Sequence, residues 1–188
     1  LMSNLNININ TAPTNSTITL QSDDNASLSN INIISTWVSS PQSNHFYITQ
    51  GQFEALNQQW SIYSPETIIQ STSLFHVGNI KIFNQDQWAT FSIHKDPDHE
   101  TSAKMQFNDF SLSWISEFFP TGGLMFEGDI DGFVEMYQQD QTPNFTANLT
   151  VDNCVIEDYL LGHLSLKSQW QQQSNMILLD ISSLTQRE

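Results

Sequence analysis

Basic residues are scarce in this chain. Its 188 residues include five Lys and Arg against twenty Asp and Glu, which gives a formal net charge of −15 and a pI near 4.3. Such a surface repels phosphate backbones and anionic lipid headgroups. The composition therefore disfavours nucleic-acid binding and membrane docking through a basic patch. The chain is nevertheless too rich in Ile, Leu, Phe and Trp to be disordered.

Cysteine is almost absent, and long apolar runs are missing. The lone Cys154 excludes a disulfide within the chain and a zinc site built from cysteines. No stretch reaches the roughly 18 consecutive apolar residues of a membrane-spanning helix. No signal peptide opens the chain. We expect a segment of a longer protein, with any membrane anchor or export signal outside it.

The sequence also lacks motifs of catalysis and of metal or nucleotide binding. It contains no H-E-x-x-H and no G-x-S-x-G, and its five histidines are scattered. Gly128 and Gly132 do not fit a G-x-G-x-x-G nucleotide loop. We interpret them as residues that relieve crowding or permit a strand to curve. We therefore predict that the chain is not an enzyme and has no catalytic residue, no metal site and no cofactor.

Two groups of carboxylates are candidates for calcium or acid–base sites. The first group alternates along an expected strand and consists of Glu127, Asp129, Asp131 and Glu135. A flat strand would space these side chains about 7 Å apart, which is too wide for one calcium ion. The second group lies in a polar loop and consists of Asp96, Asp98 and Glu100, with His94 and His99 beside them. It lacks the glycine and distal glutamate of an EF-hand, so we interpret both groups as solvated surface.

Alternation of apolar and polar residues is the main pattern of the chain. Between Thr142 and Asp152, one side carries Phe145, Ala147, Leu149 and Val151, and the other carries Thr146, Asn148 and Thr150. Because strand side chains alternate between faces, this is typical of a sheet with one apolar and one wet surface. The pattern recurs over most of the chain and predicts short antiparallel strands with polar links.

One segment departs from this rhythm. In Ser111–Phe119, the residues Leu112, Ile115 and Phe119 recur at helical spacing, and Pro120 ends the segment. We predict a single helix of about two turns there, docked on a sheet by its apolar stripe. The expected fold class is all-β, an elongated antiparallel groove of short strands with this one helix.

The order of motifs in the second half resembles the TamB family of translocation and assembly proteins, in particular its Bacteroidetes-like members. The resemblance rests on Gly123-Leu-Met-Phe-Glu-Gly128-Asp-Ile-Asp-Gly132, then Pro143-Asn-Phe-Thr-Ala-Asn-Leu149, then Leu161-Gly-His-Leu-Ser-Leu166. It covers roughly residues 58–182. We accordingly divide the chain into an N-terminal strand segment, 1–57, and a groove segment, 58–188, that continues it.

The resemblance implies a periplasmic bridge that is anchored in the inner membrane and reaches the outer one. Such proteins fold as a long β-groove, or "taco", that is lined with apolar side chains. They partner a TamA-like outer-membrane assembly barrel and are implicated in phospholipid transport and in outer-membrane protein assembly. The part of the family that meets the barrel is missing here, so the chain would be an internal length of groove.

If the chain is such a groove, specific apolar side chains should line it and contact phospholipid acyl chains. The candidates are Leu124, Phe126, Ile130, Phe145, Leu149, Val151, Leu164 and Leu166. The alternative is a secreted or surface β-sandwich that serves as a binding or adhesion module, with carbohydrate as one candidate ligand for Trp37, Trp60 or Trp88. Alternation is the same in both cases, because a sandwich core also needs strands with one apolar face.

Overall fold

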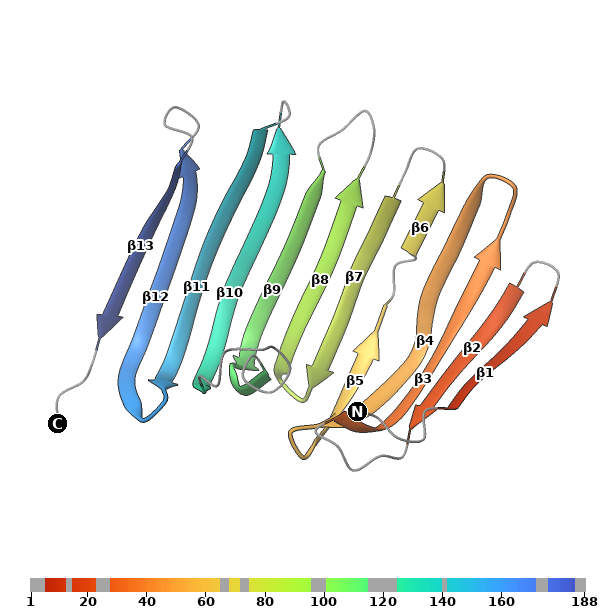
Figure 1. Cartoon of the computed structure of the whole chain (residues 1–188), viewed down its shortest axis with the longest axis horizontal. Helices are drawn as coiled ribbons and strands as arrows, with labels where there is room; N and C mark the ends of the chain where they lie inside the picture. Colours follow the sequence, from red (N-terminus) through yellow and green to blue (C-terminus); the bar gives the residue numbers. More distant parts are fainter. Residues whose placement is uncertain are drawn as a thin grey trace. The chain divides into compact units, whose positions relative to one another are not determined.

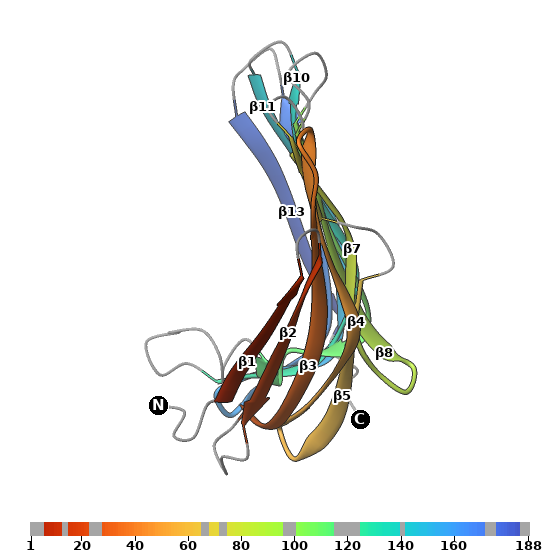
Figure 2. The ribbon, with the colours of Figure 1, turned by 90° about the vertical axis from the view of Figure 1, so that its right-hand side faces the viewer.

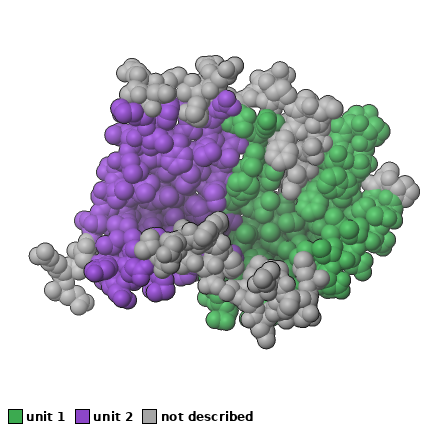
Figure 3. Space-filling model, in the orientation of Figure 1, with its two compact units in different colours: residues 1–85, 90–101 green, residues 86–89, 102–188 purple. Residues whose placement is uncertain are grey.

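The computed structural model describes residues 6–12, 15–22, 28–64, 68–71, 75–95, 101–114, 125–139, 142–171 and 176–184. Nearly all of these residues lie in β-strands, and the strands pair antiparallel (Figure 1). The prediction of an all-β chain of antiparallel strands is therefore confirmed. The chain divides into two compact units, unit 1 with residues 1–85 and 90–101 and unit 2 with residues 86–89 and 102–188 (Figure 3).

Unit 1 is an antiparallel sheet in which most neighbours in sequence are also neighbours in space. Its strands are β1 (Asn6–Ala12), β2 (Asn15–Ser22), β3 (Leu28–Ser39), β4 (Ser43–Ala55), β5 (Gln58–Tyr63), β6 (Ile68–Ser71), β7 (Phe75–Asn84) and most of β8 (Gln87–Lys95). The strand order is β1-β2-β3-β4-β5-β7-β8, and the short β6 pairs with β4 and β7. The boundary expected after residue 57 falls in the turn between β4 and β5, and these two strands pair directly.

Unit 2 is an antiparallel meander. Its strands are β9 (Ser102–Ser111), β10 (Phe126–Gln139), β11 (Thr142–Ile156), β12 (Tyr159–Gln171) and β13 (Met176–Leu184). They lie in sequence order, β9-β10-β11-β12-β13, and each pairs with the next. The connections β10–β11 and β11–β12 are short, as antiparallel neighbours allow.

Tight turns join several strands, and their residues have left-handed backbone angles. Leu56 and Asn57, between β4 and β5, have φ of 53° and 59°. Two consecutive positive φ values fit a hairpin turn whose twist matches that of the strands. Gln85, with φ of 53°, lies in the turn between β7 and β8, and Glu157, with φ of 55°, lies in the turn between β11 and β12.

The helix predicted for Ser111–Phe119 lies mostly outside the described residues. Ser111 is the last residue of β9, and Ser113 and Trp114 have helical conformation. Residues 115–119 are not described. The Trp114 ring packs against Phe110, with centroids 5.5 Å apart, so the segment begins in contact with the end of β9.

Bulges interrupt three of the longer strands. Asn30 in β3, Asp109 in β9 and Asn153 in β11 have φ of 49°, 52° and 52°, and each coincides with a register shift. Asn and Asp tolerate this conformation better than most residues do. A bulge bends its strand and increases the local twist, and Figure 2 shows the long strands β3 and β4 of unit 1 curved along their length.

Side chains on neighbouring strands stabilise two of these bulges. The backbone N–H of Asp109 donates a hydrogen bond to Oδ1 of Asp131, 3.0 Å away on β10. The side-chain amide of Asn30 donates to the carboxylate of Glu54 on β4. The Asp131 carboxylate thus has a structural role in unit 2.

Candidate apolar binding face

The strand register gathers the apolar side chains of unit 2 on one face of its sheet. Cross-strand partners share a face, so the pairs Ile130↔Val151, Leu149↔Leu166 and Leu166↔Ile181 place these residues together. We define the apolar face of unit 2 by this register. It consists of Ala103, Met105, Phe107 and Phe110 of β9, Ile130, Gly132, Val134 and Met136 of β10, Phe145, Ala147, Leu149 and Val151 of β11, Leu164, Leu166, Ser168 and Trp170 of β12, and Ile177, Leu179, Ile181 and Ser183 of β13.

The apolar face contains no charged residue among its members. The opposite face is mainly polar, with pairs such as Glu135↔Lys104, Asn148↔Lys167 and Thr150↔Ser165. Phe133 is an exception on that face, and Nζ of Lys104 lies 5.5 Å from its ring centroid. Unit 2 is therefore amphipathic across the thickness of a single sheet.

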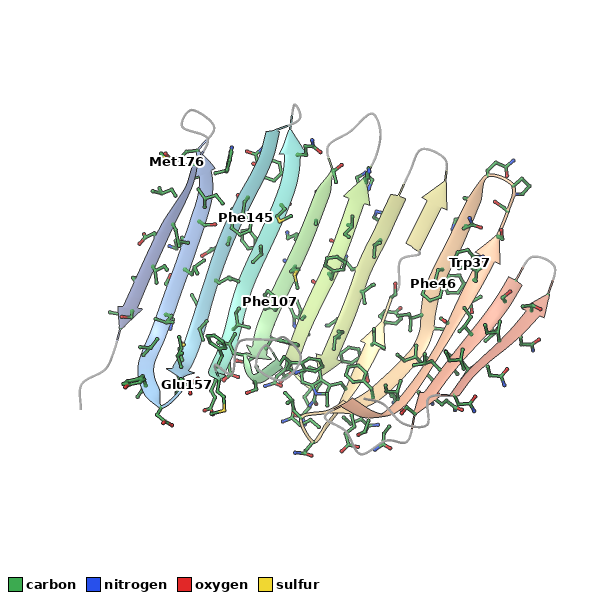
Figure 4. The ribbon with its side chains drawn as sticks, viewed as in Figure 1. Trp37, Phe46, Phe107, Phe145, Glu157 and Met176 are labelled. Atoms are coloured by element: carbon green, nitrogen blue, oxygen red, sulfur yellow. The ribbon has the colours of Figure 1, made fainter. Side chains whose placement is uncertain are left out.

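Most of the groove candidates share this face. The register places Ile130, Phe145, Leu149, Val151, Leu164 and Leu166 together, on three adjacent strands. Phe126 lies beyond the bulge and pairs with Ile156. Leu124 lies outside the described residues. Figure 4 shows two aromatic members of the face, Phe107 on β9 and Phe145 on β11.

Much of the apolar face is open at its margins. In unit 2, all described strands belong to one sheet, so no second described sheet packs on it. Ile130 and Ala147, near the middle, are only 8% and 3% exposed because larger neighbours surround them. Ile177, Leu179 and Ile181 on β13 are 52–60% exposed. Contiguous exposed apolar surface of this kind marks an interaction site or a liability for aggregation.

Unit 1 repeats the same arrangement. Its register puts apolar residues on one face, namely Ile7, Ile9, Ile18, Leu20, Ile31, Ile33, Trp37, Phe46, Ile48, Phe53, Trp60 and Ile62. Trp37 and Phe46 are cross-strand partners whose ring centroids lie 6.3 Å apart (Figure 4). Trp60 is buried, so its ring offers no free face to a sugar. Trp37 is partly exposed, so it is the better candidate of these two for carbohydrate stacking.

The carboxylates of β10 lie on or near the polar face. Asp129 pairs with Asp152 and is close to Asp109 and Asp131. Burial, followed by repulsion from these three carboxylates, raises the pKa of Asp129 above its ordinary value of 3.8. Oδ1 of Asp152 lies 2.5 Å from Nδ1 of His163. The arrangement fits a solvated polar surface, as interpreted from the sequence.

Potential reactive and metal-binding groups are dispersed. Cys154 is buried, and burial raises the pKa of its thiol. His76 and His94 lie with their Nδ1 atoms 3.2 Å apart in unit 1. The described part of the chain holds no group of three or more His, Cys, Asp or Glu side chains that could bind a metal ion. The acidic loop of Asp96, Asp98 and Glu100 lies outside it.

Sequence reasoning missed part of the apolar face. Ser168 and Trp170 continue the alternation of Leu164 and Leu166, so their place was readable from that strand. Met176–Leu179 is an uninterrupted apolar run without alternation, so its inward residues could not be assigned before the pairing of β13 with β12 was known.

No protein-family model, curated protein or solved structure matches this chain. Among the described residues, no helix has the length and apolar character needed to span a membrane.

Proposed function

We propose that this chain provides an apolar β-sheet surface for phospholipid acyl chains, as an internal segment of a TamB-like bridge between two membranes. The observation that carries the proposal is the apolar face of unit 2, which extends over β9 to β13 without a charged residue. Its function in this proposal is non-enzymatic: transport of phospholipid, assembly of outer-membrane proteins, or both. The periplasmic location and the TamA-like partner come from the sequence resemblance alone.

Acyl chains suit this surface physically. Burying a methylene group is worth about 0.8 kcal/mol, so an alkyl chain of ordinary length gains several kcal/mol on an apolar surface. Burial of the exposed side chains of β13 would also contribute favourable free energy, because the lipid removes them from water. A charge among these groups would lose its hydration without a compensating partner.

The β-sandwich alternative requires a second sheet over each apolar face. Two sheets of a sandwich lie about 10 Å apart, and their inner side chains interdigitate. In each unit, the described strands form one sheet, and Ile177, Leu179 and Ile181 remain more than half exposed. This arrangement favours the lipid-binding proposal over a filled sandwich core.

Adjacent residues on β11 allow a direct test. Leu149 belongs to the apolar face and Asn148 to the polar face, so Leu149→Asp and Asn148→Asp introduce the same carboxylate on opposite sides. We expect Leu149→Asp to lower phospholipid occupancy at least tenfold, and Asn148→Asp to leave it near that of the parent. Ile130 lies on the same face, on β10, two strands away from β12. Ile130→Arg should therefore lower phospholipid occupancy as Leu149→Asp does.

Occupancy should be measured by native mass spectrometry of the full 188-residue chain, with thermal stability measured on the same samples. Lost occupancy with a melting temperature close to the parent's supports a surface for lipid. Unfolding of Leu149→Asp, combined with absence of lipid from the folded parent, would overturn the proposal, since an unpaired charge in a filled core is strongly destabilising.

A further inference from the structure

Two small side chains lie next to each other in the apolar face of unit 2, within the row formed by Val134, Ala147, Ser168 and Leu179. Ala147 on β11 and Ser168 on β12 are cross-strand partners, and Leu179 follows on β13. Leu149 and Leu166 form the next row on one side, and the row on the other side contains Phe145 and Trp170. The rows on either side lie about 14 Å apart along the strands, with the Ala147–Ser168 pair midway. Ala147 and Ser168 are 3% and 5% exposed because these larger side chains stand around them.

Two polar atoms in this region have no hydrogen-bond partner. They are Oγ of Ser168 and Nε1 of Trp170, both buried. The two residues are two positions apart on β12, so their side chains leave the same face about 7 Å apart. Buried polar groups are nearly always paired, and each exception needs an explanation.

A serine hydroxyl on such an apolar face can find a hydrogen-bond acceptor within the sheet. Ser35, on the apolar face of unit 1, is also buried, and its Oγ donates to the carbonyl oxygen of Ile18 at 3.3 Å. Ser168 makes no such bond. A hydroxyl and an indole N–H without partners, on an otherwise apolar surface, are suited to an acceptor oxygen carried by an apolar ligand.

Charge narrows the choice of ligand. The apolar face has no charged member, and the chain carries a net charge of −15. A fatty-acid carboxylate or an anionic lipid would meet long-range repulsion and no counter-charge. An ester carbonyl is an uncharged acceptor at the base of an acyl chain, and a zwitterionic phospholipid carries two of them.

We propose that Ser168 and Trp170 bind an ester carbonyl of a zwitterionic diacyl phospholipid, whose acyl chain lies over the Ala147–Ser168 pair. The inference rests on the proposed function and adds the lipid's linkage and headgroup charge to it. The Ser168 hydroxyl and the Trp170 indole N–H donate to the ester oxygen. Access needs rotamer changes of neighbouring side chains, and Ile177 and Leu179 on β13 are exposed enough to make them.

The test compares two phosphatidylcholines of equal chain length, one with ester and one with ether linkages. The ether lipid keeps the headgroup and the hydrocarbon but lacks the carbonyl oxygen. We expect the parent chain to bind the ester lipid about three- to tenfold more tightly, the ratio that one net hydrogen bond provides. Ser168→Ala should reduce this ratio to about one. Ser165→Ala, on the polar face of the same strand, should preserve it.

Stability measurements separate binding from folding in these variants. Ser168→Ala removes an unpaired buried hydroxyl, so its melting temperature should equal or exceed the parent's. Trp170→Phe removes the N–H and keeps an aromatic ring, and it should also lower the ester preference. Equal binding of ester and ether lipids by the parent would overturn this inference and leave the acyl-chain surface intact. Binding of neither lipid would overturn the proposed function and this inference with it.

Discussion

Gly132 on β10 lies so close to Asn148 on β11 that a Cβ atom at Gly132 would stand 2.0 Å from the Asn148 carbonyl oxygen. Gly132 also has φ of 114°, in a region that side chains rarely adopt. It lies two residues before Val134 on the apolar face, next to the point where β9 bulges at Asp109. The glycine thus permits two strands to approach where the sheet departs from regular pairing.

Replacement of Gly132 by alanine should destabilise unit 2 severely. The new methyl group meets backbone rather than a movable side chain, and the positive φ adds about 1–3 kcal/mol of strain. We expect Gly132→Ala to cost more than 3 kcal/mol in urea unfolding, on the scale of the largest single-residue effects. Val134→Ala, two residues along the same face, should cost less, because it only removes methyl groups. A variant Gly132→Ala as stable as the parent would show that β10 and β11 do not approach in this way.

Asp129 should make folding stability depend on pH in acid. Because burial and three nearby carboxylates raise the pKa of Asp129 in the folded state, its ionised form is disfavoured there. Its contribution to stability is fully present below the unfolded value of about 3.8 and is lost as pH rises through the folded pKa. Asp129→Asn should therefore raise the melting temperature at pH 7, and the gain should shrink as pH falls towards 3.8.

A matched control for that experiment is Asp180→Asn. Asp180 lies opposite Lys167 on the neighbouring strand, so removal of its charge deletes a favourable pair and should give no gain at pH 7. The melting temperatures of both variants, measured from pH 3 to pH 8, would show whether the gain depends on the ionised carboxylate of Asp129. A gain for Asp129→Asn that is equally large at pH 3 would contradict the assignment to an ionised carboxylate.

Alternation predicted the strands well because the chain alternates apolar and polar residues along most of its strands. Leu149 and Asn148, for example, lie on opposite faces of β11, as their positions in the sequence indicate. The register did not follow from the sequence, since it depends on bulges at Asn30, Asp109 and Asn153. Asn and Asp are frequent throughout the chain, so nothing local distinguishes these three from the others.

The sequence did not predict the part of the candidate site that is formed by the pairing of neighbouring strands. Ser168 is a polar residue in an apolar series, and only its neighbours Ala147 and Leu179 show that it is enclosed by apolar groups. The run Met176–Leu179 gave no periodic signal, because side chains on both faces of β13 are apolar. The pairing of β13 with β12 places Ile177 and Leu179 on the apolar face.

Photo-crosslinking at two adjacent positions tests the lipid surface most directly. Leu166 belongs to the apolar face and Lys167 to the polar face of β12, so a photoreactive phenylalanine analogue at each position samples opposite sides of one sheet. The full chain would be incubated with phosphatidylcholine vesicles, irradiated and analysed by mass spectrometry for covalent lipid adducts. We expect abundant adducts from position 166 and few from position 167. Equal yields from both positions, or adducts only from position 167, would contradict the assignment of the apolar face to phospholipid acyl chains.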